Sequence, residues 1–191
     1  MSDAERKAEE ALRRLRSTIK YADRETPIRS VLVVDVDRDS PSGLGAGLAD
    51  AFNRAGDRTR FVNADRRTGP SREPGLTDLI EDSEDASGIV AGMSLTIPVG
   101  TNPEADVLTG NGFDRALELL LNDCSYVVLC CAPLPDYGDA VALAPRVDAI
   151  ILSVSSGETR RAKAVEAKEA LERVGAPILG FVMIERGRKW F

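Results

Sequence analysis

The stretch that decides the fold is SVLVVDVDRDSPSGLGAGLADAF, from Ser30 to Phe52. It begins with a run of β-branched residues, continues as a loop rich in Gly, Ser and Asp, and ends in a helical pattern of apolar residues. Strand, glycine loop and helix build phosphate sites in α/β proteins, where backbone N–H groups and the positive helix end face an anion. A Lys usually completes such a site, but no Lys occurs between Lys20 and Lys163. The stretch therefore predicts the architecture of a phosphate site without its usual cation.

Length and composition indicate one domain. A chain of 191 residues with 43% apolar content can bury a single core. The net charge of -6 argues against non-specific binding to nucleic acid, which rests on positive patches. The sequence has no apolar run of membrane-spanning length, and its N-terminus, MSDAERKAEE, is too charged for a secretory signal. We therefore expect a cytoplasmic protein.

The chain contains no histidine and three cysteines. Without histidine it lacks the commonest general base, the His-paired nucleophiles and most zinc and iron sites. Cys124, Cys130 and Cys131 form neither a disulfide framework nor a zinc spacing, so we expect reduced thiols and no metal centre built on them. Any chemistry would depend on carboxylates, Lys, Arg or bound magnesium.

Helical and strand patterns alternate along the chain. The spacing of apolar residues predicts helices over 4–22, 48–55, 76–80, 113–120, 140–144 and 159–175. Apolar and β-branched runs predict strands over 31–34, 59–63, 95–99, 126–131, 149–154 and 178–184. This order predicts an α/β protein with an open, mostly parallel sheet and helices on both faces. We divide the single domain 1–191 into an amphipathic helix (1–26), an α/β core (27–184) and a basic, aromatic tail (185–191).

Loops that follow neighbouring parallel strands meet at one edge of a sheet, where ligands of such folds bind. The loops in question are 35–47, 63–67, 131–139 and 155–159. A nucleotide, if one binds, would sit there.

Several segments resemble the cytoplasmic kinase domain of bacterial tyrosine kinases (BY-kinases), within the ParA/MinD branch of P-loop ATPases. They are, in order, EALRRLRSTIKYA, FVNADRR, GLTDLI, TIPVGTNPEADVL, YVVLCCAPLPDYGDAVALAPRVDAIILSV and SSGETRRAKAVEAKEALERVGAPILGFVM. The shared order and spacing cover nearly the whole chain. The resemblance implies a P-loop NTPase-like, three-layer α/β/α fold and a place in bacterial capsule or exopolysaccharide synthesis.

The catalytic positions of the family are altered in this chain. Aligning backward from Leu48 places Ser40, Pro41, Ser42 and Gly43, followed by Gly45, in the phosphate loop, where the family carries a Gly-Lys-Ser/Thr step. Asn63 stands where the family's Asp-x-Asp motif begins, and Cys130 replaces the acid that ends the central strand. The C-terminal tyrosine cluster that the family phosphorylates is also missing, because the chain ends in RGRKWF. We therefore expect a degenerate phosphate loop and no confident catalytic residue.

Two acids remain near the expected site. Asp65 and Asp139 are either a magnesium or nucleotide remnant or, as we favour, loop acids that cap turns. We expect no cofactor, with Mg-ATP or Mg-ADP as the ligand if the site is retained. A dinucleotide site is not expected, because Leu48 occupies the position of the third glycine in G-x-G-x-x-G.

The first helix carries the family's oligomerisation signature E-x-x-R-x-x-R at Glu10, Arg13 and Arg16. The alternative is a solvated helix face with local ion pairs. Similarly, the tail RGRKWF has a composition that favours anionic membrane surfaces, but it is also typical of a frayed chain end.

These observations favour a non-catalytic, kinase-like subunit that regulates polysaccharide assembly by binding. The resemblance implies that the protein binds a second copy of itself or a kinase paralogue. It also implies binding to the cytoplasmic part of a membrane-embedded chain-length regulator. It places the protein in the cytoplasm, with possible contact to the inner membrane face. The alternatives are an active tyrosine autokinase or ATPase with an atypical site, and a nucleotide sensor without turnover.

Overall fold

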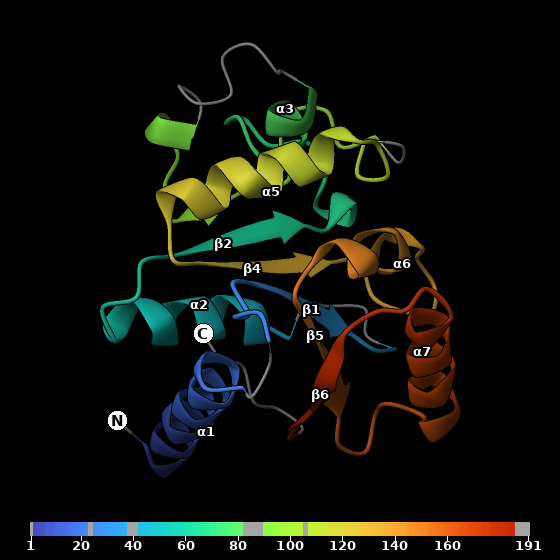
Figure 1. The fold of residues 1–191 in the computed structure, drawn as a ribbon. Helices are drawn as coiled ribbons and strands as arrows, with labels where there is room; N and C mark the ends of the chain where they lie inside the picture. Colours follow the sequence, from blue (N-terminus) through green and yellow to red (C-terminus); the bar gives the residue numbers. More distant parts are fainter. Residues whose placement is uncertain (1, 23–24, 38–41, 82–89, 105–106, 186–191) are drawn as a thin grey trace.

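The structure is a computed structural model that describes residues 2–22, 25–37, 42–81, 90–104 and 107–185 (Figure 1). Within this part of the chain, six parallel strands form one sheet in the order β3-β2-β4-β1-β5-β6. The strands are β1 (Ser30–Asp35), β2 (Thr59–Ala64), β3 (Thr96–Ile97), β4 (Tyr126–Cys131), β5 (Ala149–Ser155) and β6 (Ile178–Ile184). The helices are α1 (Asp3–Lys20), α2 (Leu44–Arg54), α3 (Leu76–Glu81), α5 (Gly112–Asp123), α6 (Asp139–Leu143) and α7 (Arg161–Arg173), with short 3-10 turns η1 (Arg66–Thr68) and η2 (Ala144–Arg146). The expected α/β fold is thus confirmed.

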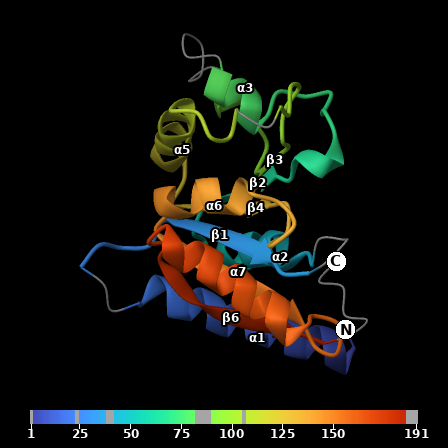
Figure 2. The same cartoon turned by 90° about the vertical axis from the view of Figure 1, so that its right-hand side faces the viewer.

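The helices cover the sheet from both sides, which gives three layers (Figures 1 and 2). One apolar cluster joins α1 and α2 to alternate residues of β1, β4 and β5. A larger cluster joins α3, α5, α6 and α7 to the other face of the same strands. Because successive residues of a strand point to opposite faces, the buried central strands have few polar positions, as their sequences predicted.

The first helix is fixed at both its beginning and its apolar face. Ser2 and Glu5 form a reciprocal capping box, in which each side chain accepts a hydrogen bond from the other residue's backbone N–H. Leu12 and Ile19 are buried against the α2 side of the core, whereas most charged residues of α1 face outward. None of the described helices combines the length and the hydropathy that a membrane span requires.

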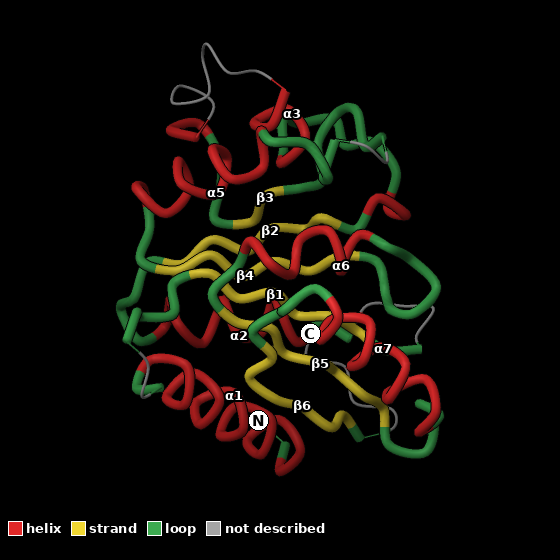
Figure 3. The backbone as a smooth tube through the Cα atoms, turned by 45° about the vertical axis from the view of Figure 1, so that its right-hand side comes forward, coloured by secondary structure: helices red, strands yellow, loops and turns green. Residues whose placement is uncertain are grey.

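The chain reverses its direction of travel across the sheet between β1 and β4. Helix α2 leads from β1 past β4 to β2, and α6 leads from β4 past β1 to β5 on the opposite face (Figure 3). The carboxyl ends of β1 and β4 therefore flank the switch point, where ligands bind in open α/β sheets.

Most element boundaries differ from the sequence-based expectation by three residues or fewer, but α2 and β3 differ in ways that have a clear physical cause. Helix α2 begins at Leu44, four residues before the expected start at Leu48, because Gly43 in a left-handed conformation (φ 75°) ends the preceding loop there. Strand β3 keeps only two of the five expected residues. Pro98 has no N–H to donate, and its carbonyl oxygen accepts a hydrogen bond from Leu76 N–H at the beginning of α3.

Candidate functional site

The loops expected to meet at the carboxyl edge of the sheet do so. Leu134, after β4, donates its N–H to Asp35 O (3.1 Å), and its carbonyl oxygen accepts the N–H of Asp37 (3.0 Å). The Thr159 hydroxyl, after β5, donates to Val36 O (3.2 Å). The loops after β1, β4 and β5 therefore form one continuous surface at the switch point.

The beginning of α2 lies on this surface, and its backbone amides already bind acceptors from their own chain. Ser42 N–H donates to Asp35 Oδ2 (2.8 Å), and Leu44 N–H donates to Ser42 Oγ (3.2 Å). The second carboxylate oxygen of Asp35 is buried, and no described residue donates a hydrogen bond to it. A negative charge of the protein thus lies where a phosphate would meet the helix. Ser40 and Pro41, the other expected loop residues, lie outside the described part of the chain.

Gly45 allows α2 to approach the sheet closely. A Cβ at this position would overlap the Cys130 thiol and come within 3.2 Å of the Phe61 ring. The glycine that the sequence suggested for phosphate binding therefore has a packing role in this structure, and the Cys130 side chain fills the space beside it.

Cys130 lies at the carboxyl end of β4, directly paired with Val33 of β1 and Asn63 of β2. Burial and the carboxylates of Asp35 and Asp65 raise the pKa of the Cys130 thiol. A thiol kept protonated neither binds magnesium nor attacks a substrate. Asn63 uses its side-chain oxygen locally, accepting a hydrogen bond from Asp65 N–H (3.0 Å).

Asp65 is buried and paired with an arginine. Its carboxylate accepts hydrogen bonds from Arg67 N–H (3.0 Å), from Arg67 Nε (2.9 Å) and from Arg67 Nη2 (2.7 Å). The pairing with Asp65 raises the pKa of Arg67, whose guanidinium also lies 5.3 Å from the centre of the Tyr137 ring. Asp65 therefore caps the turn η1 and forms an ion pair with Arg67.

Asp139 is paired in the same way. Its two carboxylate oxygens accept hydrogen bonds from Arg66 Nη2 (2.8 Å) and Arg66 Nε (3.1 Å), and the residue is only 5% exposed. Consecutive arginines of η1 thus bind the two acids that the sequence offered as magnesium ligands. Within the described residues, no three acidic or Cys side chains are grouped so that they could hold a metal ion.

The two arginines and Tyr137 are the residues of this edge that sequence reasoning missed. Arg66 and Arg67 stand in a polar loop, and their partners could not be assigned before the loops after β2 and β4 were placed side by side. The doublet of arginines next to Asp65 was the available signal.

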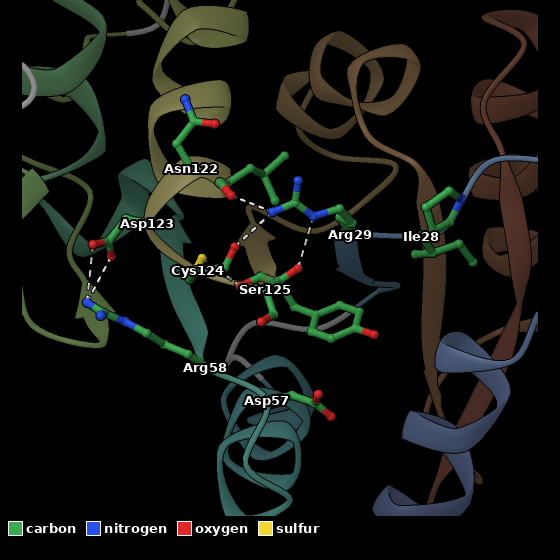
Figure 4. Close-up of a pocket in the computed structure, with 11 residues that line it drawn as sticks. Ile28, Arg29, Asp57, Arg58, Asn122, Asp123, Cys124 and Ser125 are labelled. Carbon is green, nitrogen blue, oxygen red and sulfur yellow. Dashed lines mark hydrogen bonds and ion pairs between the residues drawn. The ribbon is translucent and has the colours of Figure 1, made fainter.

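The opposite, amino edge of the sheet carries a hollow of about 570 Å³. Its wall is organised by Arg29, which donates hydrogen bonds to the carbonyl oxygens of Leu121, Cys124 and Ser125 at the end of α5 (Figure 4). Arg58 binds the Asp123 carboxylate on the other side (3.0 Å). Because these polar groups bind one another, we assign the hollow a structural role in capping α5.

The expected interface residues lie on α1, but they differ in their surroundings. Glu10 pairs with Arg13 (2.8 Å) and Arg14 (3.2 Å), and these two arginines lower the pKa of Glu10. Arg16 turns inward and donates to Ala51 O of α2 (3.1 Å). Beside this face of α1 is a hollow of about 620 Å³ whose described lining comes from Arg6, Lys7, Glu10, Ala11 and Arg14.

The parallel sheet, the crossover pattern and the loop-to-helix junction after β1 define a P-loop NTPase-like α/β protein, which confirms the expected fold. No model of a known protein family matches the sequence. Its homologues are nevertheless bacterial tyrosine kinases. The chain is 28% identical over 192 residues to tyrosine-protein kinase CpsD of Streptococcus pneumoniae, covering 93% of this chain and 84% of that protein. It is 25% identical over 191 residues to tyrosine-protein kinase YwqD of Bacillus subtilis, covering 91% of this chain and 79% of that protein.

Structural comparison agrees with the sequence comparison at the level of the fold. The kinase domain of the Escherichia coli tyrosine kinase ETK superimposes with a TM-score of 0.77 at 21% identity, covering 94% of this chain and 77% of that one. The sequence-based assignment to a BY-kinase type of fold is therefore confirmed.

Proposed function

We propose that this protein is a non-catalytic relative of the bacterial tyrosine kinases, which regulates capsular or exopolysaccharide assembly by binding other proteins. It would work in the cytoplasm, as an oligomer with itself or with a catalytic paralogue, next to the cytoplasmic part of a membrane-embedded chain-length regulator. The homology to tyrosine-protein kinases supports the biological setting. The residues at the carboxyl edge support the loss of catalysis.

The observation that carries the proposal is the charge arrangement around the beginning of α2. A phosphate-binding loop needs positive charge and unoccupied amides, but here the Asp35 carboxylate accepts the Ser42 N–H (2.8 Å). The arginines Arg66 and Arg67 bind Asp139 and Asp65, so their charge is already compensated. The described residues therefore do not fit a magnesium-bound nucleotide: the cations and the acids that such a ligand requires bind each other.

Electrostatic magnitudes support the same conclusion. A carboxylate about 4 to 8 Å from a phosphate group opposes binding by about 2 to 4 kcal/mol at an effective dielectric constant near 20. A change of this size corresponds to roughly 30-fold to 1,000-fold in affinity. Asp35 alone would therefore weaken a modest nucleotide site below a useful range.

Helix α1 supports the binding role. Its outer face is charged and partly hollowed. Helix α1 lies beside α2 and away from α6 (Figure 1), so its outer face can contact another protein without nucleotide chemistry. Arg13, which is exposed and held in place by Glu10, is the side chain best placed for such a contact.

Isothermal titration calorimetry tests the proposal with Mg-ATP and Mg-ADP. We expect no measurable heat of binding for the unchanged protein and no hydrolysis of ATP. Micromolar binding would contradict the proposal. If bound ATP then stayed intact, the protein would be a nucleotide sensor, and if it were hydrolysed or transferred to tyrosine, the protein would be an active enzyme with an atypical site.

The Asp35→Asn variant separates charge from architecture. Asn keeps an oxygen that can accept the Ser42 N–H but removes the negative charge, so the fold is expected to persist. If Asp35 is what excludes the anion, nucleotide affinity increases by roughly 30-fold or more. The matched control is Asp37→Asn. The Asp37 carboxylate accepts the Arg160 N–H (3.4 Å) and no amide at the beginning of α2 among the described residues.

A further inference from the structure

Strand β6 forms one end of the sheet and has the character of a strand that is normally covered. Within the described residues it pairs with β5 alone. Its sequence ILGFVMI contains no charged residue and no proline, the two features that usually protect an edge strand from pairing. Phe181 is 48% exposed and Met183 is 70% exposed, both on an otherwise regular part of the strand.

The backbone of β6 offers its second side for pairing. Ser156 N–H donates to Ile184 O (2.8 Å), so the polar backbone groups of Ile184 face β5. Because these groups alternate along a strand, those of Phe181 and Met183 face away from the sheet. The irregular register between β5 and β6 is confined to Ile150 and Ile151, near the beginning of β6, and the pairing is regular from Gly180 to Ile184.

We propose that β6 pairs with the same strand of a second copy of this protein, antiparallel and around a two-fold axis at Val182. A two-fold axis perpendicular to the sheet keeps equivalent faces of both sheets on the same side. In this register Phe181 lies directly opposite Met183 of the partner subunit, and Met183 lies opposite the partner's Phe181. The two exposed side chains thereby cover each other in two sulfur–aromatic contacts.

Self-complementarity favours a second copy over an unrelated peptide, because the exposed side chains of Phe181 and Met183 cover each other across the two-fold axis. Any charged residue in β6 would face a like charge near the two-fold axis, but the chain is uncharged from Val174 to Ile184. Phe181 and Met183 are two residues apart, so both side chains lie on the same face of the sheet. An antiparallel pair centred at Val182 therefore places each of them opposite the other residue of the second copy. Because an edge-to-edge contact buries less surface than a standard interface, the dimer is weak and forms at high protein concentration.

This surface is independent of the α1 face that the proposed function uses. Strand β6 and the outer side of α1 present different groups, an apolar backbone edge in one case and exposed ion pairs in the other. Failure of one interface would therefore leave the other intact.

Sedimentation equilibrium of the whole chain over a range of concentrations provides the first test. The substitution Met183→Lys places a charge beside the two-fold axis and is expected to weaken self-association at least tenfold, about 1.4 kcal/mol. The control is Leu95→Lys, which adds the same charge at another exposed apolar residue (47%) beside β3, at the other end of the sheet. An equal effect of both substitutions, or a monomer at every concentration, would overturn the proposal.

Cross-linking tests the register. The two Val182 residues would form a non-hydrogen-bonded pair, whose Cα atoms lie close enough for a disulfide. We expect Val182→Cys to form a covalent dimer under mild oxidation, whereas the unchanged protein, with its three native cysteines, does not. A dimer that resists cross-linking at this position but dissociates with Arg13→Glu would assign self-association to α1 and refute the β6 pairing.

Discussion

Arg60 is the largest fully buried side chain of the described residues, with only 1% of its surface exposed. It binds the Asp123 carboxylate through Nε (2.8 Å) and Nη2 (2.6 Å). Its remaining donors reach the carbonyl oxygens of Val90 (3.0 Å), Met93 (3.2 Å) and Ser94 (3.0 Å). One guanidinium thus ties the end of α5 to the segment that leads into β3.

Replacing this side chain is expected to destabilise the protein strongly. Arg60→Met preserves much of the volume but leaves several buried carbonyl oxygens without their donor and leaves the Asp123 carboxylate paired only with the exposed Arg58. We expect this to cost about 3 kcal/mol. The loss would appear as a lower midpoint of urea unfolding followed by circular dichroism.

Arg58 is the matched control, because it binds the same Asp123 carboxylate from the surface (3.0 Å), with a side chain that is 58% exposed. Arg58→Met is expected to cost less than about 1 kcal/mol, since exposed ion pairs contribute little. Equal effects of the two substitutions would contradict the argument that burial makes Arg60 important.

At the scale of single residues, only part of the candidate site can be predicted from the sequence. The residue types at Asn63 and Cys130 can be read from the sequence, but the ion pairs of Asp65 and Asp139 cannot. Ion pairs such as Arg66 with Asp139 join residues far apart in the chain, so they depend on which strands become neighbours. The packing role of Gly45 is hidden for the same reason, because Cys130 belongs to another strand.

At the scale of elements, the contact between α2 and β4 depends on one glycine. We expect Gly45→Ala to destabilise the protein by about 1 to 3 kcal/mol, because the added Cβ overlaps the Cys130 thiol and forces the helix away from the sheet. Thermal or urea unfolding measures the change.

Adding Cys130→Ala to that variant removes the overlap, so the double variant is expected to be more stable than the sum of the single effects predicts. The favourable coupling would be about 1 kcal/mol or more. Additive effects would mean that Gly45 is required for another reason, such as the approach of a ligand to the loop.

The elements themselves were largely predictable. Alternating apolar runs and helical spacing identified the strands and helices, because their burial follows the periods of two and 3.6 residues. The errors fall at β3, where Pro98 and the beginning of α3 take over the backbone bonds, and at α2, where Gly43 sets an earlier start. Both errors arise from backbone contacts that local patterns do not contain.

At the scale of the whole molecule, the order of strands places the loops at the carboxyl ends of β1, β4 and β5 on one edge and β6 at one end of the sheet. The alternation of strands and helices predicted the parallel sheet, but the exposed apolar edge at β6 required the strand order. A strand such as ILGFVMI has the sequence of a buried strand, and only its terminal position shows that one side is uncovered.

The proposed contact through α1 makes a separate prediction for the oligomeric state. Arg13→Glu is expected to shift any oligomer toward monomer in light scattering, because it reverses a charge on the outer face while α1 keeps its packing. Arg16 is less suitable for this test, since its side chain supports α2 through Ala51 O (3.1 Å). The control is Arg161→Glu, which makes the same change at an exposed residue in the first turn of α7, on the other face of the sheet from α1. An unchanged mass for Arg13→Glu would contradict the assignment.

The neighbouring cysteines of β4 provide a way to measure local opening of the core by thiol labelling. Cys130 packs in the layer of α1 and α2, whereas Cys131 packs in the layer of α5, α6 and α7. Burial raises the pKa of both thiols. Cys131 is buried and reacts with a labelling reagent only after its layer opens, whereas Cys130 is partly buried and responds to changes in the layer of α1 and α2. The labelling rates of these two neighbouring cysteines therefore report separately on the two layers of the core. A partner that binds α1 would slow the labelling of Cys130 and leave the labelling of Cys131 unchanged.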